Sequence, residues 1–237
     1  KTAVVMLIAG AVAAYKFAGA AITQEKAVMN LSSALKATGQ ESEEATKSFQ
    51  KQASAMQLVT TLGDEQILQM MTQATNLGVQ SDQLTDVTKA AIGLGQALNI
   101  DVNSAMKMAA LATAGETTML RRYIPELRSA TSKTQELAIV QKVANAGWQQ
   151  AQDETDTTGG ALKQMWNALG DVAEKIGDFL LPMLKKIGIY MADNAAAIGS
   201  FITGGLTWLW NAGLKVFSTL THAVQNWRKY LELAMVG

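Results

Sequence analysis

Residues 76–109 read NLGVQSDQLTDVTKAAIGLGQALNIDVNSAMKMA, and this stretch decides the fold. Two turns within it share one pattern, in which Gly78 or Asn99 ends a helix and Ser81 or Asp101 caps the next. After each turn, apolar residues resume at the three- and four-residue spacing of an amphipathic helix: Leu84, Val87 and Ala91, then Ala105, Met108 and Ala109. Helices joined by turns this short fold back as hairpins, so we predict an all-α protein.

The helical pattern continues on both sides of these turns. Residues 63–150 are predicted to form a small helical core domain, in which Pro125 begins or kinks a helix after the run Leu120-Arg121-Arg122. The predicted core residues are Leu94, Leu98, Met108, Leu111, Leu120, Leu127, Ile139 and Val143.

Residues 23–62, which precede this domain, are predicted as amphipathic helices. Gly39 is the expected end of one helix, and Ser42 opens the next with Glu43 and Glu44 in its first turn. Residues 151–160, AQDETDTTGG, are a predicted polar hinge, and residues 161–190 a further amphipathic helix that meets Pro182. The apolar positions of this last helix include Leu162, Met165, Trp166, Leu169, Val172 and Ile176.

Residues 1–22 are predicted as a hydrophobic helix, because only Lys16 interrupts the apolar run. The run is long enough to span a bilayer. A signal peptide and an Ala-rich helix buried in an oligomer are the alternatives. Gly10, Ala14 and Ala18 recur every four residues, a spacing that lets helices approach closely, and they are candidate membrane or oligomer contacts.

Residues 191–237 are predicted as hydrophobic and amphipathic C-terminal helices and as a second candidate membrane segment. Residues 194–214 carry no charge, and small residues such as Gly199 and Thr203 favour contact between helices. The remaining candidates for contact with a membrane or another copy are Leu206, Trp208, Trp210 and Trp227. Both ends of the chain, Lys1 and a run of apolar residues, suggest an internal piece of a longer protein.

The composition excludes several kinds of chemistry. The chain of 237 residues has no Cys, one His, 20 basic and 20 acidic side chains. Without Cys there is no disulfide framework, Cys-ligated metal or thiol catalysis, and a single His argues against a multi-His metal site or a His-dependent triad. A net charge of zero argues against a strong nucleic-acid surface. We expect no cofactor and no metal.

Isolated motifs do not change this expectation. Gln40-Glu41-Ser42 resembles the catalytic-Glu motif of lytic transglycosylases, but only three residues match, and a helix-capping turn explains them. Asp153, Glu154 and Asp156 lack the spacing of a calcium loop. Arg121 and Arg122 fit a solvated helix end better than a contact with DNA or an acidic partner. We predict no catalytic residue and no enzyme.

A series of landmarks between Val28 and Leu184 resembles the helical core of phage tail length tape measure proteins. Each landmark is weak alone, but their order and spacing together are specific. They are LGVQSDQL at 77–84, AAIGLG at 90–95, AALATAGE at 109–116, LRRYIP at 120–125, TTGGALKQMWN at 157–167 and IGDFLLP at 176–182.

The resemblance implies a long helical protein inside the phage tail tube, which sets tail length while tube subunits assemble around it. On infection it would be released and help DNA pass the host envelope. The implied partners are further copies of the chain, expected as a trimer, the tail tube protein, tail tip or baseplate proteins, tail assembly chaperones and the host inner membrane after ejection. The implied location is the virion, and later the host membrane, with no sequence-specific nucleic-acid binding.

Two other functions remain open. A pore-forming or membrane-translocated helical protein would use the same hydrophobic segments without needing the landmarks, and copurification with tail tube subunits would separate the two. A peptidoglycan-cleaving enzyme would rest on Glu41 alone.

Overall fold

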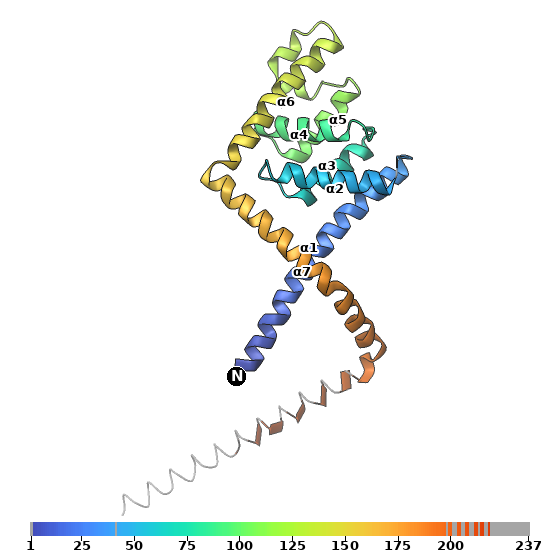
Figure 1. Cartoon of the computed structure of the whole chain (residues 1–237), viewed down its shortest axis with the longest axis vertical. Helices are drawn as coiled ribbons and strands as arrows, with labels where there is room; N and C mark the ends of the chain where they lie inside the picture. Colours follow the sequence, from blue (N-terminus) through green and yellow to red (C-terminus); the bar gives the residue numbers. More distant parts are fainter. Residues whose placement is uncertain are drawn as a thin grey trace, which may run out of the picture. The chain divides into compact units, whose positions relative to one another are not determined.

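The computed structural model describes residues 2–40 and 42–197, then residues 199, 200, 203, 204, 207, 208, 211, 212, 214, 215 and 218, with side chains from Lys16 onward. In this part of the chain every regular element is a helix and none is a strand, which confirms the all-α prediction (Figure 1). The chain divides into two compact units, a first unit of residues 1–181 and a second of residues 182–237.

The helices follow one another in a simple order. They are α1 (Thr2–Ala37), α2 (Glu43–Gln57), α3 (Asp64–Asn76), α4 (Leu84–Leu98), α5 (Val102–Thr113), the short 3-10 helices η1 (Leu120–Arg122) and η2 (Pro125–Arg128), α6 (Lys133–Thr155) and α7 (Thr158–Asp193). α7 begins in the first unit and extends into the second.

Most of the predicted turns form as expected. After α1, Gly39 has a φ of 70°, a left-handed conformation that favours glycine, and the Ser42 side chain accepts a hydrogen bond of 2.9 Å from the Ala45 N–H to cap α2. After α4, Asn99 is left-handed and Asp101 caps α5. The predicted cap at Ser81 is wrong, because residues 81–83 form a turn and α4 begins without a side-chain cap.

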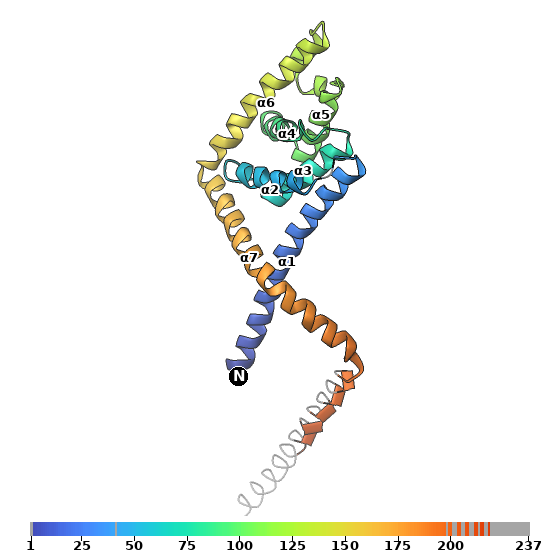
Figure 2. The same cartoon turned by 45° about the vertical axis from the view of Figure 1, so that its right-hand side comes forward.

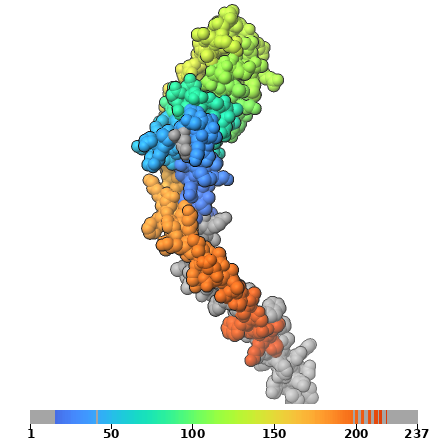
Figure 3. All heavy atoms as spheres, turned by 90° about the vertical axis from the view of Figure 1, so that its right-hand side faces the viewer, coloured from blue at the N-terminus to red at the C-terminus, as the bar shows by residue number. Residues whose placement is uncertain are grey.

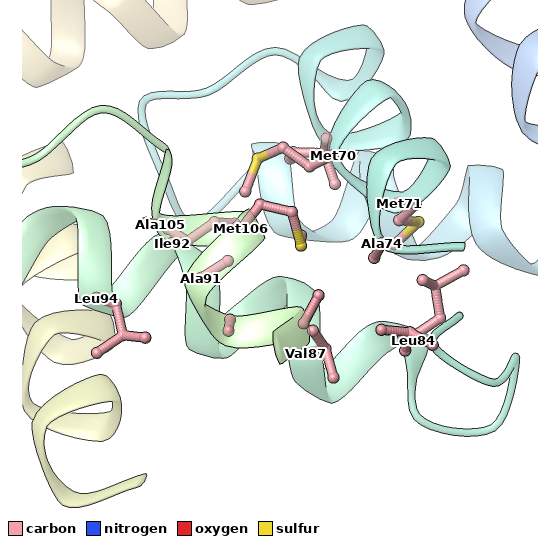
Figure 4. Close-up of a cluster of buried hydrophobic side chains, with 14 of the residues drawn as sticks. Met70, Met71, Ala74, Leu84, Val87, Ala91, Ile92, Leu94, Ala105 and Met106 are labelled. Atoms are coloured by element: carbon pink, nitrogen blue, oxygen red, sulfur yellow. The ribbon is translucent and has the colours of Figure 1, made fainter. Parts of the chain in front are cut away.

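The core of the first unit lies where α3, α4 and α5 meet, as Figure 4 shows. Met70, Met71 and Leu94 are fully buried there. α1 and α2 add Leu31, Leu35, Phe49, Ala53 and Met56 to the same cluster, and α6 adds Val140, Ala144 and Ala151. The core therefore reaches beyond residues 63–150. Among the described residues, α7 contributes no side chain to it.

The predicted core residues lie on the inner faces of these helices. Leu94, Met108, Leu120 and Leu127 are buried, and Leu98, Ile139 and Val143 pack against the core while partly exposed. Leu111 is also partly exposed.

α4 and α6 approach each other at a pair of glycines. A Cβ on Gly93 would lie 2.0 Å from the Ala144 carbonyl oxygen, and one on Gly147 would lie 1.9 Å from the Gly93 oxygen. These distances are far below van der Waals contact, so both positions require glycine for the two backbones to touch.

The segment predicted as a hinge, residues 151–160, is a tight corner between two helices. α6 continues to Thr155 and α7 begins at Thr158. The Gly160 N–H donates a hydrogen bond of 3.0 Å to the Thr157 hydroxyl, and a Cβ on Gly160 would lie 2.0 Å from the backbone carbonyl oxygen of Glu154. The missing side chain thus lets α7 turn back closely against the end of α6.

Candidate functional site

The α7 helix leaves its apolar face uncovered in the first unit. Six large apolar residues follow one another at spacings of three and four, and each is between 38% and 75% exposed. We call them the outer stripe: Leu162, Met165, Leu169, Val172, Ile176 and Phe179. Figure 3 shows α7, in yellow-orange to orange, at the surface of the molecule beside α1, in blue. An exposed apolar stripe of this length is typical of a surface that contacts another protein or a membrane.

The opposite face of α7, which meets the rest of the first unit, is polar. The Gln164 side chain donates hydrogen bonds of 2.9 and 3.3 Å to the carbonyl oxygens of Leu58 and Thr60. The Gln57 amide donates a bond of 2.8 Å to Asp171. The buried residues of α7 are Gly160, Glu174 and Gly177, none of which has a large apolar side chain. α7 is therefore attached through hydrogen bonds and close backbone contact.

The close backbone contact is a crossing of α7 with α1, which both Figure 1 and Figure 2 show. A Cβ on Gly177 would lie 2.2 Å from the Phe17 carbonyl oxygen and 2.7 Å from the Ala21 Cβ. Glycine at this position is what lets the two helices touch.

Carboxyl groups gather just beside this crossing. Asp64 and Glu65 begin α3, and Glu174 reaches them from α7, with a carboxylate oxygen of each residue within 4.8 Å of the others. Asp64 is 5% exposed and Glu174 is 9% exposed. We call Asp64, Glu65 and Glu174 the acidic cluster. Asp171, one turn before Glu174, adds a fourth carboxylate nearby.

Two glutamines from other helices organise the acidic cluster. The Gln57 oxygen accepts a bond of 2.6 Å from the Asp64 N–H, which fixes the orientation of its amide and directs its NH₂ group to Asp171. Gln24 of α1 donates a bond of 3.0 Å to Asp64 Oδ2, which also accepts one of 3.2 Å from the Ser54 hydroxyl. The site thus joins α1, α2, α3 and α7.

The electrostatics of the cluster disfavour negative charge. Burial, then a hydrogen bond with Glu65 and the charges of Asp64, Glu65 and Asp171, raise the pKa of Glu174 to about 8. Burial, and next the charge of Glu65, raise the pKa of Asp64 above its ordinary value. Both shifts favour the protonated form of these two carboxyl groups in the folded chain.

The residues singled out from the sequence as contact candidates lie elsewhere. Gly10 and Ala14 belong to the part of α1 before Lys16, whose side chains are not described. Ala18, further along the same helix, is buried. In the second unit, the Thr203 hydroxyl donates to the Gly199 oxygen at 2.7 Å, and Trp208 is 68% exposed. Leu206, Trp210 and Trp227 lie outside the described residues.

The hydropathy of the described helices bears on the two candidate membrane segments. Among the described residues from Lys16 onward, no helix is both long and apolar enough to span a bilayer. Residues 1–15, whose side chains are not described, and most of residues 201–237 lie outside it.

Other motifs from the sequence have structural roles or cannot be placed. Glu41 lies outside the described residues. Arg121 forms an ion pair of 2.5 Å with Glu136, and Glu154 forms one of 3.0 Å with Lys163. The pair at Arg121 fastens η1 to the start of α6.

Sequence reasoning missed the acidic cluster. The available signal was weak: Asp171 and Glu174, three residues apart, share one face of a helix, while Asp64 and Glu65 look like ordinary acidic residues in a first helical turn. Only the folded chain brings the two pairs together. Comparison with protein-family models, with curated proteins and with solved structures finds no match.

Proposed function

We propose that this chain is a segment of a phage tail tape measure protein, which occupies the tail tube in several copies. The observation that carries the proposal is the outer stripe of α7, since its large apolar side chains face away from their own unit and call for a helical partner. The ordered landmarks of the sequence resemblance supply the kind of assembly in which that partner is another copy.

The spacing of the outer stripe suits packing between identical helices. The steps alternate between three and four residues, which is the pattern of the 3.5-residue repeat of a left-handed coiled coil. The stripe runs for about 25 Å at a rise of ~1.5 Å per residue. In sequence the apolar positions continue at Met183, Ile187 and Tyr190, which are also exposed. Copies related by rotation about a common axis would each contribute such a helix, as a trimer in a tube requires.

The rest of the proposed function follows from the resemblance. The assembled copies template the tube protein during tail assembly, together with the tail tip or baseplate proteins and the assembly chaperones. On infection they are released, and residues 1–22 and 191–237 enter the host inner membrane to help DNA across. A pore-forming protein is the alternative, because an exposed apolar helix face also suits insertion into lipid.

The test replaces two residues of the outer stripe by polar ones. Leu169→Gln with Ile176→Gln removes apolar area from the centre of the stripe, so the purified chain is expected to lose self-association in sedimentation experiments and phage carrying the change to assemble no normal tails. The matched control is Leu137→Gln on α6, a leucine exposed to a similar extent but off the stripe.

The result also separates the two functions. If the double variant remains associated to the same extent as the control, the outer stripe is not the contact between copies. If the variant phage assembles tails of normal length, the tape measure proposal loses its main support. Leakage from lipid vesicles by the unchanged chain, without copurification of tube subunits, would favour the pore-forming alternative.

A further inference from the structure

The acidic cluster lacks positive charge to balance it. None of the ion pairs formed among the described residues involves Asp64, Glu65, Asp171 or Glu174. Buried carboxylates without partners are strongly unfavourable, and they are normally neutralised by a proton, a basic side chain or a metal ion. Asp64 and Glu174 are buried, and Glu65 and Asp171 are partly buried.

The unpaired atoms at this site identify what is missing. Asp64 Oδ1 and Glu174 Oε1 are buried without any hydrogen-bond partner, and so is Oε1 of Gln24, which comes from α1 and does not belong to the cluster. These three are acceptors, from three different helices, and the fourth unpaired buried atom among the described residues is a donor, Nδ2 of Asn167 on α7. Rotating the Gln24 amide by half a turn does not give its oxygen a partner, because the rotation would break the hydrogen bond that its NH₂ group donates to Asp64. The single amide group of Asn167 cannot serve acceptors on three helices, and a cation held between these oxygens would satisfy all three.

We propose that the acidic cluster, together with the Gln24 amide oxygen, binds a divalent cation of the oxygen-preferring class, with Ca²⁺ as the best fit. Carboxylate and amide oxygens are the ligands that Ca²⁺ takes in proteins, at about 2.3–2.6 Å. Two ligands on opposite sides of such an ion are therefore up to about 5 Å apart, and the three carboxylates already lie within 4.8 Å of one another. Mg²⁺ demands a stricter octahedron and usually keeps several of its waters, so a cage of protein oxygens suits it less well.

A cation at this site joins three helices. Glu174 belongs to α7, Asp64 and Glu65 to α3, and Gln24 to α1, so the ion fastens the polar face of α7 to the rest of the first unit. Asp171 and Gln57 lie beside it as positioning residues, since their mutual hydrogen bond aligns α7 with the start of α3. This inference does not depend on the proposed function.

The experiment uses the full chain of 237 residues, first treated with a chelator and then supplied with Ca²⁺ alone near neutral pH. We expect equilibrium dialysis to find about one tightly bound Ca²⁺ per chain, and the midpoint of thermal unfolding to rise with Ca²⁺ concentration, as for any ligand that binds only the folded state. Glu174→Gln and Asp64→Asn should each lose both effects. The control Glu44→Gln, an exposed carboxylate of α2, should keep them.

A third variant tests the proposal even if Glu174→Gln and Asp64→Asn fail to fold. Glu174→Lys places an ammonium group where the cation is expected, so it should unfold at a higher temperature than the chelated wild type and no longer respond to Ca²⁺. The proposal is overturned if the wild type binds no Ca²⁺, or if the variants at Glu174 and Asp64 respond to it as strongly as Glu44→Gln. Failure of these tests leaves the tail-assembly result at Leu169 and Ile176 unaffected.

Discussion

Helices α4 and α7 are both amphipathic, but they turn opposite faces toward the rest of the first unit. α4 buries its apolar face, including Leu84, Ile92 and Leu94, against α3, α5 and α6. α7 buries two glycines and the Glu174 side chain and leaves Leu162 and Leu169 exposed. The difference shows that amphipathic periodicity identifies which residues share a face without saying whether that face finds its partner within the chain.

The largest expected effect is the difference in stability loss between two leucine-to-alanine substitutions, one in α4 and one in α7. Leu94 is fully buried, and Leu94→Ala should cost about 2–5 kcal/mol because it leaves a cavity in the core. Leu169 is 50% exposed on the outer stripe, and Leu169→Ala should cost less than about 0.5 kcal/mol in a dilute, monomeric sample. Urea unfolding curves measure both. Equal losses would mean that the outer face of α7 is covered within its own unit.

A smaller effect is expected at the glycines of the helix contacts. Gly93→Ala should cost about 1–3 kcal/mol or more through overpacking, because its Cβ would meet the Ala144 carbonyl group of α6. Gly177→Ala should push α7 away from α1 and leave the core formed, so that hydrogen exchange rises in α7 while α4 stays protected.

Gly170 provides the control for both glycine variants. It lies on α7 with nothing within 4 Å of a built Cβ, and Gly170→Ala should raise stability by up to about 1 kcal/mol through helix propensity. A loss of stability at Gly170, or a Gly177 variant that leaves exchange in α7 unchanged, would contradict the proposed mode of attachment.

The smallest effect concerns pH and a carboxylate outside both helices. Glu136 accepts a hydrogen bond from the Thr117 hydroxyl and pairs with Arg121 and Lys133, and these contacts, the Thr117 bond foremost, lower its pKa below 4.5. The folded state therefore binds this proton less readily than the unfolded state. The stability from Glu136 is present above the unfolded pKa and is lost as the pH falls through the lower folded pKa.

Glu136→Gln should consequently be less stable than the wild type at about pH 6, and the difference should shrink toward about pH 3. Urea unfolding midpoints at a series of pH values measure it. A gap that stays constant with pH would show that the Glu136 side chain acts through packing rather than through its charge. Because Arg121 and Lys133 are substantially exposed, we expect this effect to be modest.

The sequence predicts the helices and several of their ends well, because local chemistry determines them. The left-handed positions at Gly39 and Asn99 and the caps at Ser42 and Asp101 depend on neighbours a few residues away. Ser81 is the exception, since the turn that follows Gly78 delays the start of α4.

The acidic cluster could not be predicted in the same way. Asp64 and Glu174 are brought together by the crossing of α1 and α7, which no local pattern encodes, and acidic residues in a first helical turn are common without any ligand. Similarly, the apolar spacing of α7 is visible in the sequence, but only the folded chain shows that the polar side of the helix makes the internal contacts.

The crossing of Phe17 and Gly177 also determines how the first unit carries mechanical load. It joins the middle of α1 to the middle of α7, so the chain between them forms a loop that is closed at its base. We expect tension applied to the two ends of this loop to act on the crossing first, with α2 to α6 outside the line of force. A chain drawn out lengthwise would thus separate α7 from α1 before any core helix is pulled, and the core would unravel only in a second, longer extension.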